Sequence, residues 1–285
     1  MNTVKEMRME KKEIKTLLRN IKDNKYAVPE GVNPYKLSLD MMDYIGDIDG
    51  ELRNDLACYV LLEWIVTDVL TPEEAHDIFV IALDEKRILN GLGKIDDTVF
   101  GRSFSVEVAA CIIYKHRKLL SDSDILKAFN TVLKLYNEDR DVRGFVEGKS
   151  WAHGAAHGAD ALMELAQCQV IGYEGLKKIL DSIYKKININ YYGYINNEDE
   201  RMISAVKAVL ERDIIPVEEI EEWIRSFGNI EKEGIVPDYL FIEFNVTLFL
   251  KSLYFRLVAN TKYDQIAKIV KEVLKKTSRF GEDYS

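Results

Sequence analysis

Apolar residues recur every three or four positions along nearly the whole chain, which is the spacing of one face of an α-helix. The segment that begins at Thr71 shows the pattern most clearly. Thr71 can cap a helix N-terminus, Pro72 suits the first helical turn, and Glu74 completes a capping box. Together with the apolar periodicity behind it, this start predicts a helix over residues 71–89.

Similar patterns predict helices in most of the remaining chain. The predicted ranges are 4–22, 36–46, 51–68, 97–119, 123–138, 151–168, 173–186, 199–211, 217–227, 238–259 and 262–277. A short β-branched run at 187–190 is too isolated to make a sheet. The expected fold class is therefore all-α. Two architectures satisfy it: antiparallel helix pairs stacked as an α-superhelix or solenoid of the HEAT or armadillo type, or a globular helical bundle.

The chain is predicted to form a single domain over residues 1–285, because no Pro/Gly/Ser-rich linker divides it. Residues 1–30 are expected to hold a loosely packed N-terminal helix. Acidic residues followed by arginine recur at 137–140, at 197–201 and from Asp96-Asp97 to Arg102. These segments are either degenerate solenoid units or chance similarities in a highly charged chain.

Composition narrows the classes of protein further. With 16 glycines and 5 prolines in 285 residues, the chain has few of the turns that β-sandwiches need. The net charge of −9 argues against a nucleic-acid-binding role, since phosphate contacts require clustered Lys and Arg. The most apolar segment, 239–257, carries too many polar residues for a bilayer span. Three widely spaced cysteines indicate a reducing compartment, so we expect a cytoplasmic protein without membrane or nucleic-acid partners.

The segment most suggestive of chemistry is the predicted helix at 151–168. On a helix, His153, His157, Asp160 and Glu164 would lie within about 60° of one another. The other positions are mostly alanine, glycine and leucine, which predicts a helix buried between neighbours. Glycine costs about 1 kcal/mol relative to alanine inside a helix, so its recurrence here suggests close approach of another helix or a ligand.

Three interpretations remain open for this polar stripe, which is formed by His153, His157, Asp160 and Glu164. The histidines and Asp160 could hold a divalent metal, because histidines four residues apart on a helix suit zinc. They could instead line a pocket without metal, or form a purely structural hydrogen-bond network. A zincin mechanism is not expected, because Gly154 stands where the HExxH motif has its catalytic glutamate.

Arginines near this helix extend the candidate site. If Arg102, Arg143 and Arg201 converge near helix N-termini, an anionic ligand becomes plausible. Asp–Arg pairs at helix starts are, however, more often structural clamps than catalytic devices. The full set of candidate ligand-binding residues is Arg102, Asp141, Arg143, Trp151, His153, His157 and Asp160.

Three motifs give the chain a family resemblance. These are the Arg102-Ser-Phe-Ser segment, Asp-x-Arg-Gly at 141–144, and the element WAHxxAHxAD at 151–160. In them the chain resembles the bacterial family of domains of unknown function 2785, from about Asp55 onward. The chain departs from the family pattern at Lys149-Ser150, where a glycine is expected directly before Trp151. The resemblance implies a bacterial, cytoplasmic protein and brings no established activity, substrate or cofactor.

Two functions follow from these residues. The first is a binding or scaffold module that engages a small molecule or a protein. The alternative is a hydrolase-type enzyme, water-based or metal-assisted, in which His153 or His157 acts as general base and Asp160 orients it. The identity of any cofactor and the oligomeric state stay open.

Overall fold

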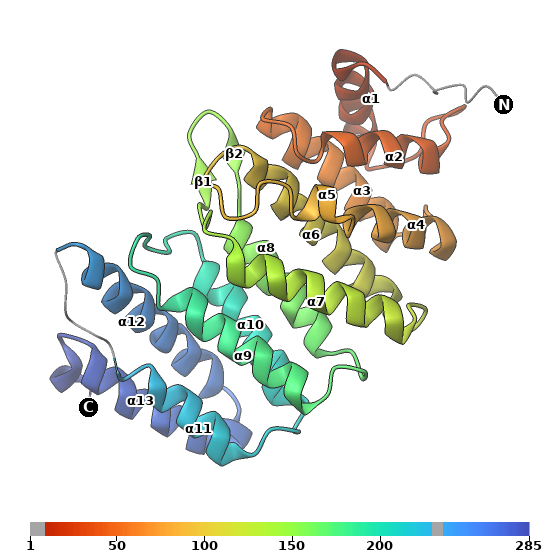
Figure 1. Ribbon diagram of the computed structural model, residues 1–285. Helices are drawn as coiled ribbons and strands as arrows, with labels where there is room; N and C mark the ends of the chain where they lie inside the picture. The colour runs from red at the N-terminus through yellow and green to blue at the C-terminus, as the bar shows by residue number, and fades with distance from the viewer. Residues whose placement is uncertain (1–8, 230–235, 285) are drawn as a thin grey trace.

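The computed structural model describes residues 9–229 and 236–284, and these residues are mostly helical (Figure 1). Their α-helices are α1 Lys11–Asp23, α2 Pro34–Tyr44, α3 Tyr59–Val66, α4 Pro72–Ala82, α5 Glu85–Ile88, α6 Thr98–His116, α7 Asp122–Glu138, α8 Gly154–Ala166, α9 Tyr173–Ile187, α10 Glu198–Glu211, α11 Val217–Ser226, α12 Asp238–Leu257 and α13 Asp264–Thr277. A π-helix, η1 (Glu51–Cys58), leads directly into α3. Short 3₁₀ turns lie at Thr261–Tyr263 and Gly281–Asp283. The prediction of an all-α fold is confirmed.

Helices that are not consecutive in sequence pack against one another in a row. The row runs α3, α6, α8, α10 and α12, each in contact with the next. Helices α7 and α9 pack together and cover one side of α8, as Figure 1 shows. Both a superhelix and a bundle can contain such a row, so the choice between these architectures stays a prediction, as does the single domain.

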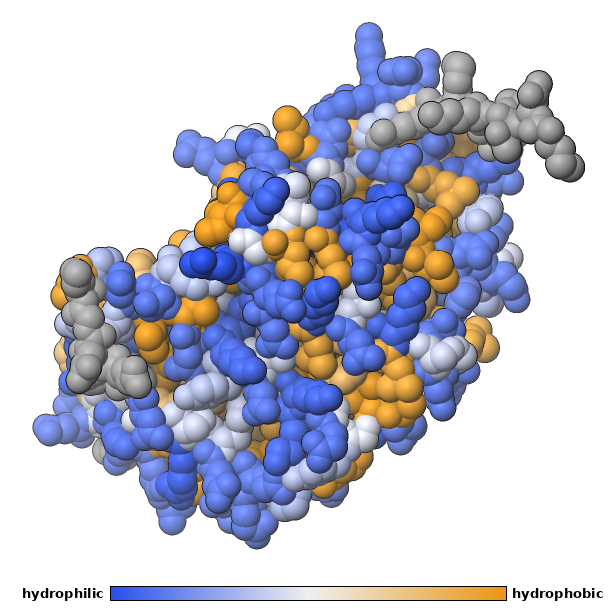
Figure 2. Space-filling model, in the orientation of Figure 1, coloured by the Kyte–Doolittle hydropathy of each residue, from blue (hydrophilic) through white to orange (hydrophobic). Residues whose placement is uncertain are grey.

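The surface over the α7 and α9 side is largely hydrophilic, with scattered hydrophobic patches (Figure 2). Apolar side chains are instead collected between the helices, where one core cluster extends from α1 to α13. Helix α1 lies in the segment expected to be loosely packed, yet it fully buries Ile14, Leu18 and Ile21. The three cysteines are free thiols.

The helix starts follow the capping signals in the sequence. Thr71 Oγ1 accepts a hydrogen bond from Glu74 N, and Thr71 N donates to Glu74 Oε2, which completes the predicted capping box of α4. The predicted helix 71–89 is nevertheless wrong in its extent. The backbone becomes extended at Asp84, which ends the first helix. The Asp84 carboxylate then accepts a hydrogen bond from Lys86 N and caps the separate helix α5.

A β-hairpin precedes α8 and corrects a second predicted helix. Strands β1 (Phe145–Val146) and β2 (Ser150–Trp151) pair antiparallel, with Phe145 opposite Trp151. Gly148 has a φ of +71° in the intervening turn, a conformation that glycine adopts without steric cost. Helix α8 therefore begins at Gly154 rather than at residue 151. The run at 187–190 forms no strand, because its first residue ends α9.

Two of the segments in which acidic residues precede an arginine lie at different kinds of helix end. Residues 137–140 lie at the C-terminal end of α7, whereas 197–201 begin α10. A degenerate repeat unit would place these residues at matching ends of matching helices. The similarity between the two segments therefore carries no evidence for solenoid units.

Candidate functional site

His153 lies beside the predicted stripe rather than on it. It precedes the first residue of α8 in the left-handed conformation, with φ 53° and ψ 26°. Gly144 O accepts hydrogen bonds from both Ala152 N and His153 N, which turns the chain from β2 into the helix. The His153 ring stacks on Trp151 with centroids 4.2 Å apart. The prediction of a helical His153 was therefore wrong, although its ring still lies 5.3 Å from that of His157.

His157 stands in the first turn of α8 and contacts α6. Its Nδ1 lies 2.9 Å from Ser103 Oγ and 3.3 Å from the Ser103 carbonyl oxygen. Its ring packs edge-on against Phe104, with centroids 5.1 Å apart. Burial lowers the pKa of His157 to about 4 and that of His153 to about 3. Both imidazoles are therefore neutral at pH 7 and add no positive charge to the site.

Each of the three candidate arginines forms an ion pair with a different aspartate. Arg102 forms a two-point ion pair with Asp139, Arg143 forms one with Asp141, and Arg201 Nη1 lies 2.7 Å from Asp160 Oδ2. Asp160 thus contacts an arginine and accepts no hydrogen bond from either histidine. The predicted hydrogen bond between Asp160 and a histidine is absent from the described residues.

Arg102 has no donor left for a ligand. Its side chain is fully buried, and all five N–H groups are used. Besides the Asp139 carboxylate, they bond to Asn90 O, Thr98 Oγ1 and Lys94 O. This arginine ties the loop before α6 to the end of α7, which is a structural task.

The glycines of α8 mark close approaches, as their cost in a helix suggests. A Cβ at Gly158 would lie 2.5 Å from the Tyr136 ring on α7. A Cβ at Gly154 would lie 2.8 Å from Asp141 O. Real Cβ atoms essentially never come this close to such neighbours, so both positions accept α7 and its following loop only as glycine. The neighbour in each case is protein rather than a ligand.

A carboxylate that the sequence analysis did not single out completes the site. Glu107 on α6 is half-buried, and its Oε2 is buried without a hydrogen-bond partner in the described chain. Burial raises the pKa of Glu107 from 4.5 to about 7, against the opposing effect of Arg201. Burial and then the charge of Glu107 also raise the pKa of Asp160. We refer to Glu107, His157, Asp160 and Arg201 as the α6–α8–α10 cluster.

The members of the cluster differ in their exposure to solvent. The Arg201 side chain is 56% exposed, whereas that of Asp160 is 11% exposed. A signal for Glu107 existed in the sequence: it is the single charged residue in the otherwise uncharged helical run from 103 to 114. A lone charge inside such a run is costly unless it is used, which makes it a candidate functional residue.

Arg53, also missed from sequence, reaches this region from the π-helix η1. Its guanidinium lies 3.8 Å from the centre of the Phe100 ring and is fully buried. It donates to the carbonyls of Lys149 and Trp151 on the hairpin. The N-terminal helices are thereby fastened to the same hairpin that carries the Trp151–His153 stack.

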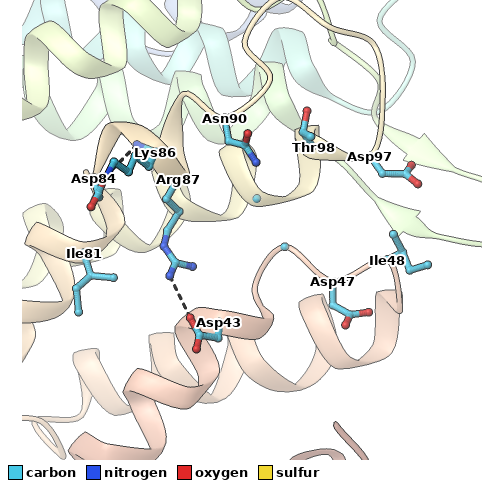
Figure 3. A pocket seen from close by; sticks show the side chains of 12 residues that line it. Asp43, Asp47, Ile48, Ile81, Asp84, Lys86, Arg87, Asn90, Asp97 and Thr98 are labelled. Atoms are coloured by element: carbon cyan, nitrogen blue, oxygen red, sulfur yellow. Dashed lines mark hydrogen bonds and ion pairs between the residues drawn. The ribbon is translucent and has the colours of Figure 1, made fainter. Parts of the chain in front are cut away.

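A separate cleft of about 630 Å³ lies between α2, α4, α5 and the start of α6. Figure 3 shows Arg87 directed towards Asp43, with Asp47, Asp97 and Thr98 also lining the space. Its charges are largely paired within the protein: Arg87 lies 3.2 Å from Asp43, and Lys149 lies 2.6 Å from Asp97. None of the candidate ligand-binding residues lines this cleft.

Neither a ready metal site nor a membrane-spanning helix is found in residues 9–229 and 236–284. Over these ranges, no group of three or more His, Cys, Asp or Glu side chains is arranged to hold a metal ion. The stripe His153, His157 and Asp160 therefore offers no ready metal site as it stands. Over the same ranges, no helix combines the length and apolar character needed to cross a membrane.

The fold and the cluster together define an all-α protein whose central helices carry a set of partly buried polar groups. The chain belongs to the family described as protein of unknown function DUF2785, whose model matches residues 88–255. That stretch contains α6 to α11 and most of α12, and hence the whole α6–α8–α10 cluster. Neither the curated proteins nor the solved structures include a match to this chain.

Proposed function

We propose that this protein is a binding module whose recognition site is the α6–α8–α10 cluster. The observation that carries the proposal is the unpaired, buried Oε2 of Glu107. An ionisable group left without a partner in the interior costs several kcal/mol, and such perturbed groups gather at functional sites. A ligand that supplies the missing hydrogen bond offsets this cost on binding.

The surroundings of Glu107 support the same proposal. Arg201 donates to Asp160 through Nη1 and its side chain is 56% exposed, so the cluster has a solvent-exposed edge at Arg201. Helix α8 packs against both α6 and α10, and the glycine at 158 lets α7 approach α8 closely as well. A site on rigid helices binds its ligand with little loss of conformational entropy.

A thermal-shift screen tests the proposal. The purified chain and Glu107→Gln are screened against amines, amino acids, sugars, nucleotides and organic acids. We expect at least one class to raise the Tm of the parent by several degrees and to leave Glu107→Gln unchanged. The control is Glu222→Gln, which removes an exposed carboxylate from α11 and should respond like the parent. Ligands that stabilise parent and Glu107→Gln equally, or a screen without any hit, would overturn the proposal.

A hydrolase is the second candidate, and one contact favours it. Ser103 Oγ lies 2.9 Å from His157 Nδ1, a distance at which a base can activate a nucleophile. His157 would accept the hydroxyl proton as Ser103 attacks an acyl carbon, and it would pass that proton to the leaving group as the bond to the acyl carbon breaks. Water would then hydrolyse the acyl–Ser103 ester, which releases the carboxylic acid and restores the serine hydroxyl. Binding comes first in our proposal because Ser103 is only 2% exposed and Asp160 does not orient His157.

An active-site probe separates the two candidates. A fluorophosphonate phosphonylates serines that a base activates. Labelling of the parent that is lost in Ser103→Ala would establish the hydrolase. An unlabelled parent, with trypsin labelled alongside as control, would exclude it.

A further inference from the structure

The charges of the α6–α8–α10 cluster do not balance when Glu107 is ionised. Glu107 and Asp160 supply two carboxylates, and Arg201 supplies one guanidinium, which bonds to Asp160. His157 is neutral at pH 7 because burial lowers its pKa to about 4. The ionised cluster therefore lacks one positive charge, and it lacks it at Glu107 Oε2.

We propose that the α6–α8–α10 cluster binds a cationic nitrogen, either a primary amine or a guanidinium, that donates to Glu107 Oε2. The inference rests on the proposed binding function and gives its ligand a chemical class. A charge-assisted hydrogen bond of this kind is about twice as strong as a neutral one. It also satisfies the acceptor that the folded chain leaves unpaired.

An anionic ligand fits the same residues poorly. It would meet the carboxylates of Glu107 and Asp160, and the arginine facing them is already engaged with Asp160. The neutral histidines offer no compensating charge. The net charge of −9 also draws cations rather than anions towards the protein over longer distances.

The cationic nitrogen has two possible sources, a free amine such as a polyamine or amino acid, and a Lys or Arg side chain of a partner protein. Both present the same group to Glu107. They differ in what surrounds the nitrogen, so the test includes both kinds of probe.

Binding is predicted to tighten as the pH rises from 6 to 8, because Glu107 must be ionised. The titratable and charged groups that interact electrostatically with Glu107 are Arg201 on α10, Asp160 on α8, and the thiols of Cys58 and Cys111. Burial raises the pKa of Cys111 to about 12 and that of Cys58 well above its ordinary value, so both thiols stay protonated across this range. Arg201 keeps its charge throughout.

Isothermal titration of the full chain provides the test. The probes are spermidine, L-arginine and a ten-residue peptide of alternating Lys and Gly, each at pH 6 and pH 8. We expect at least one probe to bind the parent and Glu222→Gln alike. Its affinity for Glu107→Gln should fall at least tenfold, and parent affinity should be severalfold weaker at pH 6. Binding of the free amines points to a small ligand, and binding of the peptide alone points to a partner protein.

Glu107→Asp is a second variant that shows whether Glu107→Gln loses affinity through misfolding. It keeps the negative charge but shortens the side chain by one methylene. Its affinity should lie between those of the parent and Glu107→Gln. Failure of all three cationic probes, or equal binding to Glu107→Gln, overturns the inference. If the thermal-shift screen then yields a Glu107-dependent neutral or anionic ligand, the binding function stands without the cationic class. If it yields none, both fail.

Discussion

Arg201 on α10 pairs with Asp160 on α8 across 2.7 Å, while Glu107 on α6 interacts electrostatically with both residues and leaves its Oε2 without a hydrogen bond. One guanidinium is thus shared unequally between two carboxyl groups. Asp160 therefore has a fixed ion-pair partner. Glu107 has none, and burial raises its pKa to about 7.

Glu107→Gln should stabilise the protein above neutral pH. The folded pKa of Glu107 is raised from 4.5 to about 7, so the folded state binds this proton more tightly than the unfolded state. Its contribution to stability is therefore complete below pH 4.5 and is lost as the pH rises through 7. The variant should match the parent at pH 4.5 and exceed it by about 2–3 kcal/mol at pH 8.

Urea denaturation at several pH values measures this difference. The comparison with the parent at each pH cancels the histidines, whose lowered pKa values act in the opposite direction. Glu222→Gln should show a pH-independent change below about 0.5 kcal/mol. A Glu107→Gln curve parallel to that of the parent at all pH values would contradict the raised pKa.

His157→Ala should destabilise the fold by about 3 kcal/mol, because it removes a buried ring from Phe104 and leaves the Ser103 hydroxyl without its partner. Ser103→Ala removes only the hydroxyl, and His157 Nδ1 keeps the Ser103 carbonyl within reach. That variant should cost about 1 kcal/mol. Equal unfolding midpoints in urea for both variants and the parent would show that the contact contributes nothing to stability.

Arg102→Lys should cost about 3 kcal/mol in the free energy of unfolding. Lysine offers three donors at one nitrogen, so it cannot reproduce five contacts or the two-point pair with Asp139. Arg225→Lys is the control, because Arg225 is exposed and meets Glu272 at 3.3 Å on the surface. Its change should stay below about 0.5 kcal/mol. The folded Arg102→Lys variant should bind the ligand with the same affinity as the parent. A loss of affinity would show that Arg102 belongs to the recognition site.

Gly158→Ala and Gly101→Ala form a matched pair within helices. The added methyl at 158 would meet the Tyr136 ring at 2.5 Å, whereas at 101 the nearest atom would be Gly46 Cα at 3.9 Å. We expect Gly158→Ala to lower stability by about 1–3 kcal/mol through overpacking. Gly101→Ala should raise it by about 0.5–1 kcal/mol through helix propensity. Thermal denaturation of both variants checks the signs, and a stabilised Gly158→Ala would disprove the close approach of α7.

The sequence predicted the helices well because their apolar period and capping residues act locally. It failed at His153, because the chain turns there through hydrogen bonds that Gly144 O accepts from Ala152 N and His153 N, beside a hairpin of only two-residue strands. Such strands carry no periodicity. The Arg102–Asp139 and Arg201–Asp160 pairs were equally invisible, because each joins residues about 40 positions apart in sequence. Glu107 could have been found from its isolation in an uncharged run, whereas its proximity to Arg201 required the packing of α6 against α8 and of α8 against α10.

Arg53 carries a consequence for how this family can vary. Arg53 lies before residue 88 and so outside the stretch that the family model matches. Its guanidinium nevertheless covers Phe100 and donates to the carbonyls of Lys149 and Trp151, and all three of these residues belong to the matched stretch. A relative that lacked the N-terminal helices would leave those carbonyls and that ring without cover. Such a protein would have to recruit a substitute cation from another segment or lose its hairpin. The leading helices and the matched stretch are therefore expected to be inherited together rather than exchanged as separate modules.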